Sequence, residues 1–219
     1  MGSASRRYLL SEGTTKMGRS IYSWSIPAVQ TCPGSSQSCR NACYATHGRF
    51  VTRTVTRLQQ WRLKQSKTAD FVDRMVDELF RRGVMVCRIH VAGDFYAASY
   101  VTRWIEIAAR SAHTRFFAYT RSWRVEKIEP VLRVFAALKN VRLWYSADRD
   151  TGSPAQPPEG VRVAWLQTSE TEDVAGNLVF QVRKLRTLEL PLAVPICPQE
   201  SPKGIARGVI CANCRICFE

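Results

Sequence analysis

Short apolar runs alternate with amphipathic segments through the middle of the chain. Apolar side chains in residues 71–80 recur with the 3.6-residue period of a helix, and the run at 84–91 that follows is typical of a buried strand. The same alternation predicts helices at 100–108 and 128–135 and strands at 116–119 and 141–145. This region therefore predicts repeated strand–helix–strand units.

Further strands are predicted on both sides of this region. Residues 20–27 alternate apolar with small polar side chains and end at a proline. The runs at 161–166 and 178–182 are also β-like, with no convincing helix between them. The stretch 51–67 is rich in arginine and permits a helix.

Strands and helices in alternation predict a parallel sheet with right-handed crossovers. About six strands are too few for a full eight-stranded barrel, which typically takes about 250 residues. We therefore expect an α/β fold built on a partial, about six-stranded parallel β/α barrel. A doubly wound sheet is the alternative, because periodicity alone does not separate the two arrangements.

The 219 residues predict one barrel with two appendages. Residues 1–18 are polar and are expected to form a flexible arm, residues 19–190 the barrel, and residues 191–219 a C-terminal cluster-binding segment. No apolar run approaches the length of about 18 residues that spans a bilayer, and the N-terminus lacks the core of a signal peptide. We expect a cytoplasmic protein that makes no use of a membrane.

Thiols stay reduced in the cytoplasm, so the eight cysteines are expected to be metal ligands, catalytic thiols or buried small residues. Cys87 lies inside an apolar run and is most simply a buried small residue. The other seven fall into two groups near opposite ends of the chain, a clustering that random burial does not explain. These groups are Cys32, Cys39 and Cys43, and Cys197, Cys211, Cys214 and Cys217.

The C-terminal group has the spacing Cys-x2-Cys-x2-Cys over residues 211–217, and Cys197 supplies a fourth thiol. The same run binds [4Fe–4S] clusters in bacterial ferredoxins. A structural zinc site is the alternative, although zinc usually takes two separated Cys-x2-Cys pairs or a mixture of cysteine and histidine. Four thiolates would close the coordination sphere, which suits a structural role or an electron relay.

The N-terminal group supplies only three cysteines, in the pattern Cys32-x6-Cys39-x3-Cys43. Three thiolates on a [4Fe–4S] cluster would leave one iron open to a substrate or cofactor. The alternative is a structural zinc site completed by His47. One shared metal centre and two separate centres both fit the spacing of the seven cysteines.

A strand followed by a three-cysteine loop, with Gly93-Asp94 after the next strand, resembles the radical S-adenosylmethionine (radical-SAM) enzymes. In that superfamily three cysteines hold a cluster whose open iron binds S-adenosylmethionine (SAM), and a Gly-Gly-Glu-like segment helps to hold the SAM amino group. The resemblance implies that Cys32, Cys39 and Cys43 are cluster ligands and that Gly93 and Asp94 contact the cofactor. The usual spacing there is Cys-x3-Cys-x2-Cys, and a single glycine precedes the acid here.

A second and closer resemblance rests on four stretches. They are Cys32-Pro33 with Cys39 and Cys43-Tyr44-Ala45, residues 88–96, residues 116–123, and the final Cys-x2-Cys-x2-Cys. These stretches resemble the phage and mobile-element family called gene product 88, and the similarity spans residues 16–219. The resemblance implies a fold and a cluster more than an activity.

Lysine and arginine exceed aspartate and glutamate by 32 − 18 = 14, which favours a polyanionic partner such as nucleic acid. Arg49, Arg53 and Arg57 would lie on one face of a helix, where like charges repel unless an anion is near. A solvated basic face is the alternative. The residues expected to contact nucleic acid are Arg49, Arg53, Arg57, Arg62, Lys64, Lys67, Arg121 and Arg124.

Three functions fit these patterns. The first is a radical-SAM-like iron–sulfur enzyme that works on or near nucleic acid. The second is a non-catalytic nucleic-acid-binding protein stabilised by an iron–sulfur cluster or zinc, and the third is a protein that passes electrons between two clusters. No phosphate-binding loop or hydrolase motif is present, so hydrolytic chemistry has little support.

Overall fold

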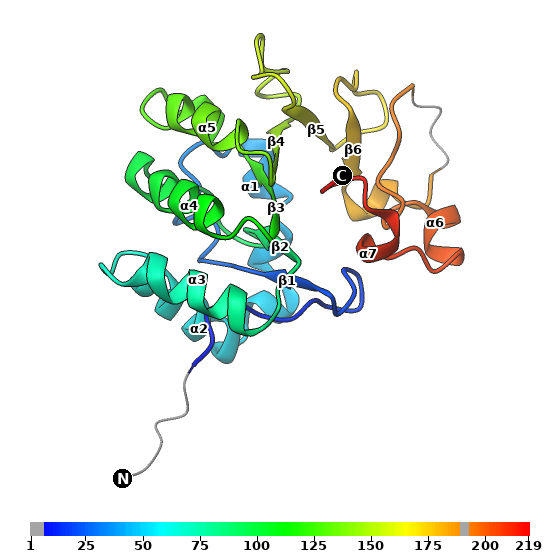
Figure 1. The fold of residues 1–219 in the computed structure, drawn as a ribbon. Coiled ribbons are helices and arrows are strands. Elements are labelled where there is room, and N and C mark those ends of the chain that lie inside the picture. Colours follow the sequence, from blue (N-terminus) through cyan, green and yellow to red (C-terminus); the bar gives the residue numbers. More distant parts are fainter. Residues whose placement is uncertain (1–6, 189–192) are drawn as a thin grey trace.

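Parallel strands form one curled sheet, an open half-barrel, at the centre of the protein (Figure 1). The computed structural model describes residues 7–188 and 193–219. Neighbouring strands pair in chain order and in parallel register throughout. The strands are β1 (Ile21–Ser23), β2 (Val86–Ile89), β3 (Arg115–Thr120), β4 (Val141–Ala147), β5 (Arg162–Gln167) and β6 (Leu178–Gln181). This order confirms an α/β half-barrel and excludes a doubly wound sheet, in which the strand order reverses at a switch point.

Helices cover the convex face of the sheet, where they form the crossovers between the first four strands (Figure 1). The connections from β4 to β5 and from β5 to β6 contain no helix, as the sequence predicts. None of the helices in the described residues is long and apolar enough to cross a bilayer. The helices of the crossovers are α2 (Arg53–Gln65), α3 (Phe71–Arg81), α4 (Ala98–Arg110) and α5 (Glu129–Ala136).

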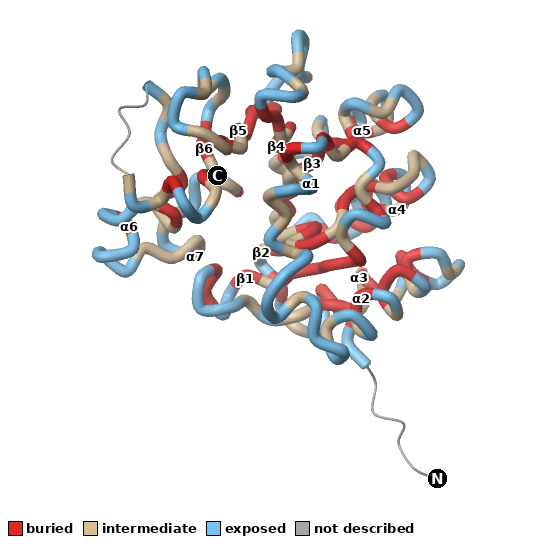
Figure 2. The backbone as a smooth tube through the Cα atoms, turned by 180° about the vertical axis from the view of Figure 1, so that it is seen from behind, coloured by how far each residue is buried: buried red, intermediate tan, exposed pale blue. Residues whose placement is uncertain are grey.

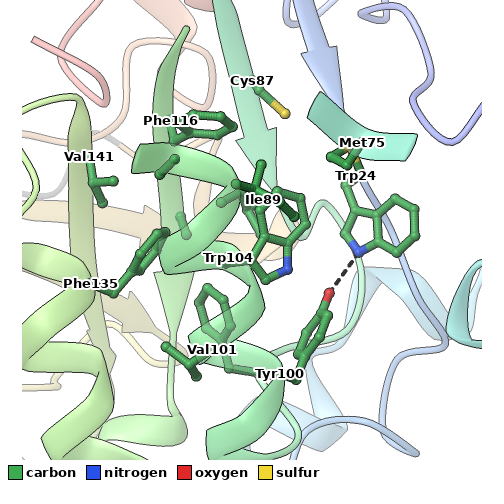
Figure 3. Close-up of a cluster of buried hydrophobic side chains, with 14 of the residues drawn as sticks. Trp24, Met75, Cys87, Ile89, Tyr100, Val101, Trp104, Phe116, Phe135 and Val141 are labelled. Carbon is green, nitrogen blue, oxygen red and sulfur yellow. Dashed lines mark hydrogen bonds between the residues drawn. The ribbon is translucent and has the colours of Figure 1, made fainter. Parts of the chain in front are cut away.

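The main core lies between the convex face and these helices (Figure 2). Cys87 and Ile89 of β2 are completely buried there, so the prediction of Cys87 as a buried small residue is confirmed. Trp104 of α4 packs beside them, and the indole of Trp24 donates a 2.8 Å hydrogen bond to the hydroxyl of Tyr100 (Figure 3). Satisfying both polar groups in this way lets large aromatic side chains fill the core.

The concave face is covered by the C-terminal segment, which contains α6 (Pro202–Ala206) and α7 (Cys211–Cys214) (Figure 1). Residues 195–197 bond along β6 through Val179, and the backbone N–H of Ala212 donates to the carbonyl of Met17 at 3.0 Å. The ring of Phe218 lies 5.5 Å from that of Phe117 on β3. Both faces of the parallel sheet are therefore shielded, as such sheets require.

Part of the segment assigned to a flexible arm is packed against the barrel. The backbone N–H groups of Leu9 and Leu10 donate to the carboxylate of Glu78 on α3 at 2.6 and 2.9 Å, and both leucine side chains are buried. Residues 1–6 of the predicted arm lie outside the described residues. So does the predicted boundary between the barrel and the C-terminal segment, at residues 190 and 191.

His90 directly follows β2 and lies in an unusual environment for a histidine. Its φ is 62°, its side chain is 3% exposed, and its Nε2 lies 3.0 Å from the hydroxyl of Tyr100. Burial lowers the pKa of His90 to about 3. The folded protein therefore holds this imidazole neutral at pH values where the unfolded chain protonates it.

We expect the substitution His90→Asn to flatten the acid dependence of stability, since asparagine tolerates a positive φ. Below the ordinary histidine pKa of about 6.5, the unfolded chain binds a proton at His90 that the folded protein does not. The free energy of unfolding of the wild type therefore falls by up to ~1.4 kcal/mol per pH unit. Urea unfolding at pH 7 and pH 5 measures this loss. The exposed-site control His113→Asn should keep the wild-type dependence, and an unchanged dependence in His90→Asn would contradict the prediction.

Candidate metal centre

The three-cysteine loop between β1 and α2 is folded around a short helix, α1 (Gln37–Asn41). The hydroxyl of Ser36 caps this helix by accepting from the backbone N–H of Cys39 at 3.0 Å. The same hydroxyl donates to Asp148 at 2.5 Å, and the N–H of Ser38 donates to Asp150 at 2.7 Å. Because both carboxylates follow β4, the loop is docked over the carboxyl ends of the strands.

A buried ion pair supports the docked loop. The Arg121 guanidinium lies 2.8 Å from the carboxylate of Asp148, and their side chains are only 7% and 0% exposed. Gly34 passes so close that a Cβ there would lie 2.0 Å from the carbonyl oxygen of Arg121. Arg124 also donates to the Gly34 carbonyl at 2.9 Å. The ends of β3 and β4 therefore dictate the path of the cysteine loop.

Asp94 joins the ends of β2 and β3 beneath the loop. Its carboxylate accepts hydrogen bonds from the backbone N–H groups of Phe95 and Arg121 and from the Thr120 hydroxyl, at 2.6–2.8 Å. Burial raises its pKa to about 6, although these hydrogen bonds oppose the rise. Gly93 has a φ of 84°, and a Cβ there would lie 2.4 Å from Ile26. Both carboxylate oxygens of Asp94 thus serve the fold, and its role as a cofactor contact stays a prediction.

The three thiols of the loop lie within electrostatic reach of one another. Burial raises the pKa of Cys32 to about 12, and negative charge on Asp94, Cys39 and Cys43 adds to the rise. Burial also raises the pKa of Cys39, which the positive charge of Arg121 opposes. Each thiol is partly buried and none is in a disulfide.

His47, the fourth ligand of the alternative zinc site, makes contacts within its own turn. Its side chain is exposed, and its Nδ1 lies 2.8 Å from the Thr46 hydroxyl and 3.2 Å from the Cys43 carbonyl. Within residues 7–188 and 193–219, no three side chains of His, Cys, Asp or Glu converge closely enough to hold one metal ion.

The C-terminal cysteines form a second set, inside the half-barrel. Cys217 accepts a 2.8 Å hydrogen bond from the hydroxyl of Tyr119 on β3, and Cys197 is buried. Burial raises the pKa of Cys217, and charge on Cys211 and Cys214 adds to the rise. Burial raises the pKa of Cys197 to about 12, with a contribution from Cys217.

Side chains that sequence patterns do not single out lie between the two sets. Arg88 of β2 points to the concave face, 5.6 Å from the ring of Tyr119. Its positive charge acts on Tyr44 in the loop and on Cys217 in the C-terminal segment. Tyr44 in turn donates from its hydroxyl to the carbonyl of Val91, just after β2. An arginine within an apolar strand was the one sequence feature that could have drawn attention to this place.

The basic residues expected to bind nucleic acid divide into an exposed and a buried group. Arg62 is buried at 3% exposure, donates to the Ser11 hydroxyl at 2.8 Å and stacks on Trp24, so its assignment to an exposed face is wrong. Arg121 is buried in its ion pair. The exposed members are Arg49, Arg53, Arg57, Lys64, Lys67 and Arg124.

The helix that carries the basic row begins later than the arginine spacing suggests. Arg49 lies in a separate 3₁₀ turn, Gly48–Val51, and α2 begins at Arg53. Only Arg53 and Arg57 therefore share a helical face by the i, i+4 rule. The stack of three arginines on one helix is corrected to a pair plus a preceding turn.

Comparison with known proteins decides the family. A family model described as Gene product 88 matches residues 5–219. The chain belongs to the gene product 88 family. The Gene 88 proteins of Mycobacterium phages D29 and L5 are each 28% identical to it, over 88% of this chain and over 81% and 80% of their own lengths. No solved structure matches this gene product 88 family member.

In this gene product 88 family member, we expect Asp148→Ala to lower the free energy of unfolding by ~3–5 kcal/mol, because it leaves the buried charge of Arg121 unpaired. The double variant Arg121→Met/Asp148→Ala should recover part of that loss. Urea denaturation provides the measurement, with the exposed-site variant Asp173→Ala as control. A single variant as stable as the control would refute the role given to this ion pair.

Proposed function

We propose that this protein is an iron–sulfur protein whose loop cysteines, Cys32, Cys39 and Cys43, hold a cluster with one open iron, as in radical-SAM enzymes. One observation carries the proposal: three thiols share one loop that is docked over the carboxyl ends of β3 and β4. In parallel β/α barrels the carboxyl ends of the strands carry the chemistry. Soft thiolate ligands suit iron–sulfur clusters.

The surroundings of the loop fit an anionic cluster. The Arg121 charge acts on Cys39, and the Arg88 charge acts on Tyr44, which follows Cys43 directly. Such a cluster, when bound, supplies an electron and an open iron for SAM. The protein would provide three ligands, a rim tied to the sheet by Asp94 and Asp148, and a partly buried position that limits access of water.

Mutation of the loop cysteines tests this proposal directly. In anaerobically purified protein, the triple variant Cys32→Ala/Cys39→Ala/Cys43→Ala should lose about four iron and four sulfide per chain. The control Cys87→Ala, which changes a core cysteine, should lose neither. Equal iron content in the triple variant and the wild type, or zinc in place of iron, would sink the proposal.

Incubation of the cluster-loaded protein with dithionite and SAM distinguishes a radical-SAM-like enzyme from a non-catalytic module and from an electron carrier. Formation of 5′-deoxyadenosine supports a catalytic radical-SAM-like protein. A loaded protein that forms none is a non-catalytic module or an electron carrier.

We also propose that the protein contacts nucleic acid through the basic residues beside the cysteine loop. No acidic residue occurs between Glu12 and Asp70, although this stretch contains the whole loop and α2. Arg53 and Arg57 are exposed on α2, and neither forms an ion pair with a carboxylate of the described residues. Tyr44, in the 3₁₀ turn that follows Cys43, is 57% exposed and packs edge-on against Phe50 at 5.5 Å. Basic side chains with an exposed aromatic ring are typical of nucleic-acid surfaces.

We expect Arg53→Gln/Arg57→Gln to weaken binding of labelled DNA and to reduce the salt slope by about 1.8, since each lost phosphate contact removes about 0.9. Fluorescence anisotropy with single- and double-stranded oligonucleotides at several salt concentrations measures both quantities. The matched control Arg183→Gln/Lys184→Gln removes two exposed charges after β6, at the opposite edge of the sheet. Equal effects of both variants would indicate a diffuse charge attraction and contradict the assigned surface.

A further inference from the structure

The C-terminal segment carries its four cysteines into the concavity of the half-barrel. Side chains of β4 and β5 hold this segment by its carbonyl groups: Trp144 donates to Cys217 at 3.0 Å and Arg162 to Ile216 at 2.9 Å. On the other side, the N–H of Cys211 donates to the carbonyl of Lys16 at 3.1 Å. The segment is thus fixed to β4 and β5 on one side and to the chain just before β1 on the other.

The backbone folds the final cysteines back toward one another. Cys211 and Cys214 begin and end one helical turn, α7, and place their side chains on neighbouring positions. Arg215 then adopts the left-handed conformation with a φ of 62°. Cys217 follows two residues later, close enough to Cys211 and Cys214 for their charges to raise its pKa. Cys197 arrives separately, with its N–H bonded to Val179 on β6 at 2.8 Å.

The surroundings of these thiols are apolar rings and positive charge. Cys217 packs with Tyr119, Trp144 and Phe180. Positive charge on Arg88 acts on both Cys211 and Cys217. The Nε of Arg88 is buried and has no hydrogen-bond partner in the described part of the chain. Arg88 as a whole is half-buried, but a buried N–H group without a hydrogen-bond partner is costly, and an anion beside it would remove that cost.

We propose that Cys197, Cys211, Cys214 and Cys217 hold a second [4Fe–4S] cluster inside the half-barrel, distinct from the centre proposed for the loop. Four thiolates coordinate all four irons, so this cluster has no open position and does not bind substrate. Its negative charge is balanced by Arg88, and the Tyr119 hydroxyl donates to the Cys217 sulfur. The cluster joins the C-terminal segment to β6 through Cys197 and so keeps the concave face covered.

The inference is independent of the loop centre, and iron content in three variants separates the two. Cys217→Ser should lose about four iron per chain while the loop-cysteine triple variant keeps about four. The control Cys87→Ala should keep the full iron content of the wild type. A wild type with about four iron, lost only in Cys217→Ser, would refute the loop centre and leave the C-terminal cluster standing. Iron unchanged in Cys217→Ser, or one zinc per chain, would overturn the second cluster.

Tyr119→Phe tests the same cluster without removing a ligand. Hydrogen bonds to cluster sulfurs influence the reduction potential, and donation stabilises the more negative, reduced state. We therefore expect this variant to keep its iron and to show a lower midpoint potential in an anaerobic redox titration followed by electron paramagnetic resonance. Tyr96→Phe, which changes a half-buried tyrosine on the helix side, should leave the potential unchanged. An unaltered potential in Tyr119→Phe would contradict Cys217 as a ligand.

Discussion

A parallel sheet needs cover on both faces, and an open half-barrel leaves its concave face without any. This requirement shapes the protein. Helices α2–α5 shield the convex face, but the concave face of a half-barrel has no second half to close it. The C-terminal segment fills that place, with Phe218 against Phe117 and Cys217 against Trp144. In its described part, residues 193–219, the segment contains two short helices and few completely buried apolar side chains. Additional cross-links would therefore stabilise it. Four cysteines in this segment are the residues suited to that task.

The rim of the half-barrel depends on a different kind of interaction. The buried carboxylate of Asp148 accepts a hydrogen bond from Ser36 of the cysteine loop, and Arg121 balances its charge. Asp94 adds a link between β2 and β3 at the same level. The loop is therefore held by polar groups of low exposure, which have rigid geometry when all partners are present. These contacts fix the position of the loop, so its three thiols are not needed to hold it in place.

Much of this fold follows from local pattern. The apolar periods around Met75, Trp104 and Leu132 predict α3, α4 and α5, and the strand order follows from their alternation with strands. Helix α1 escaped prediction because it is one serine-capped turn without an apolar stripe. Arg62 was misplaced because a run of charges does not reveal which side chain points inward; its partners Ser11 and Trp24 are distant in the chain. The Arg121–Asp148 pair is likewise set by tertiary packing, which spacing does not encode.

The central claim is that both cysteine sets bind iron–sulfur clusters, one at the rim and one in the concavity. Anomalous scattering at the iron absorption edge, from crystals grown anaerobically, tests it most directly. We predict two separate iron peaks, one bounded by Cys32, Cys39 and Cys43 and the other by Cys197, Cys211, Cys214 and Cys217. Peaks at the zinc edge alone, or no metal beside either set of cysteines in protein purified anaerobically, would contradict the account.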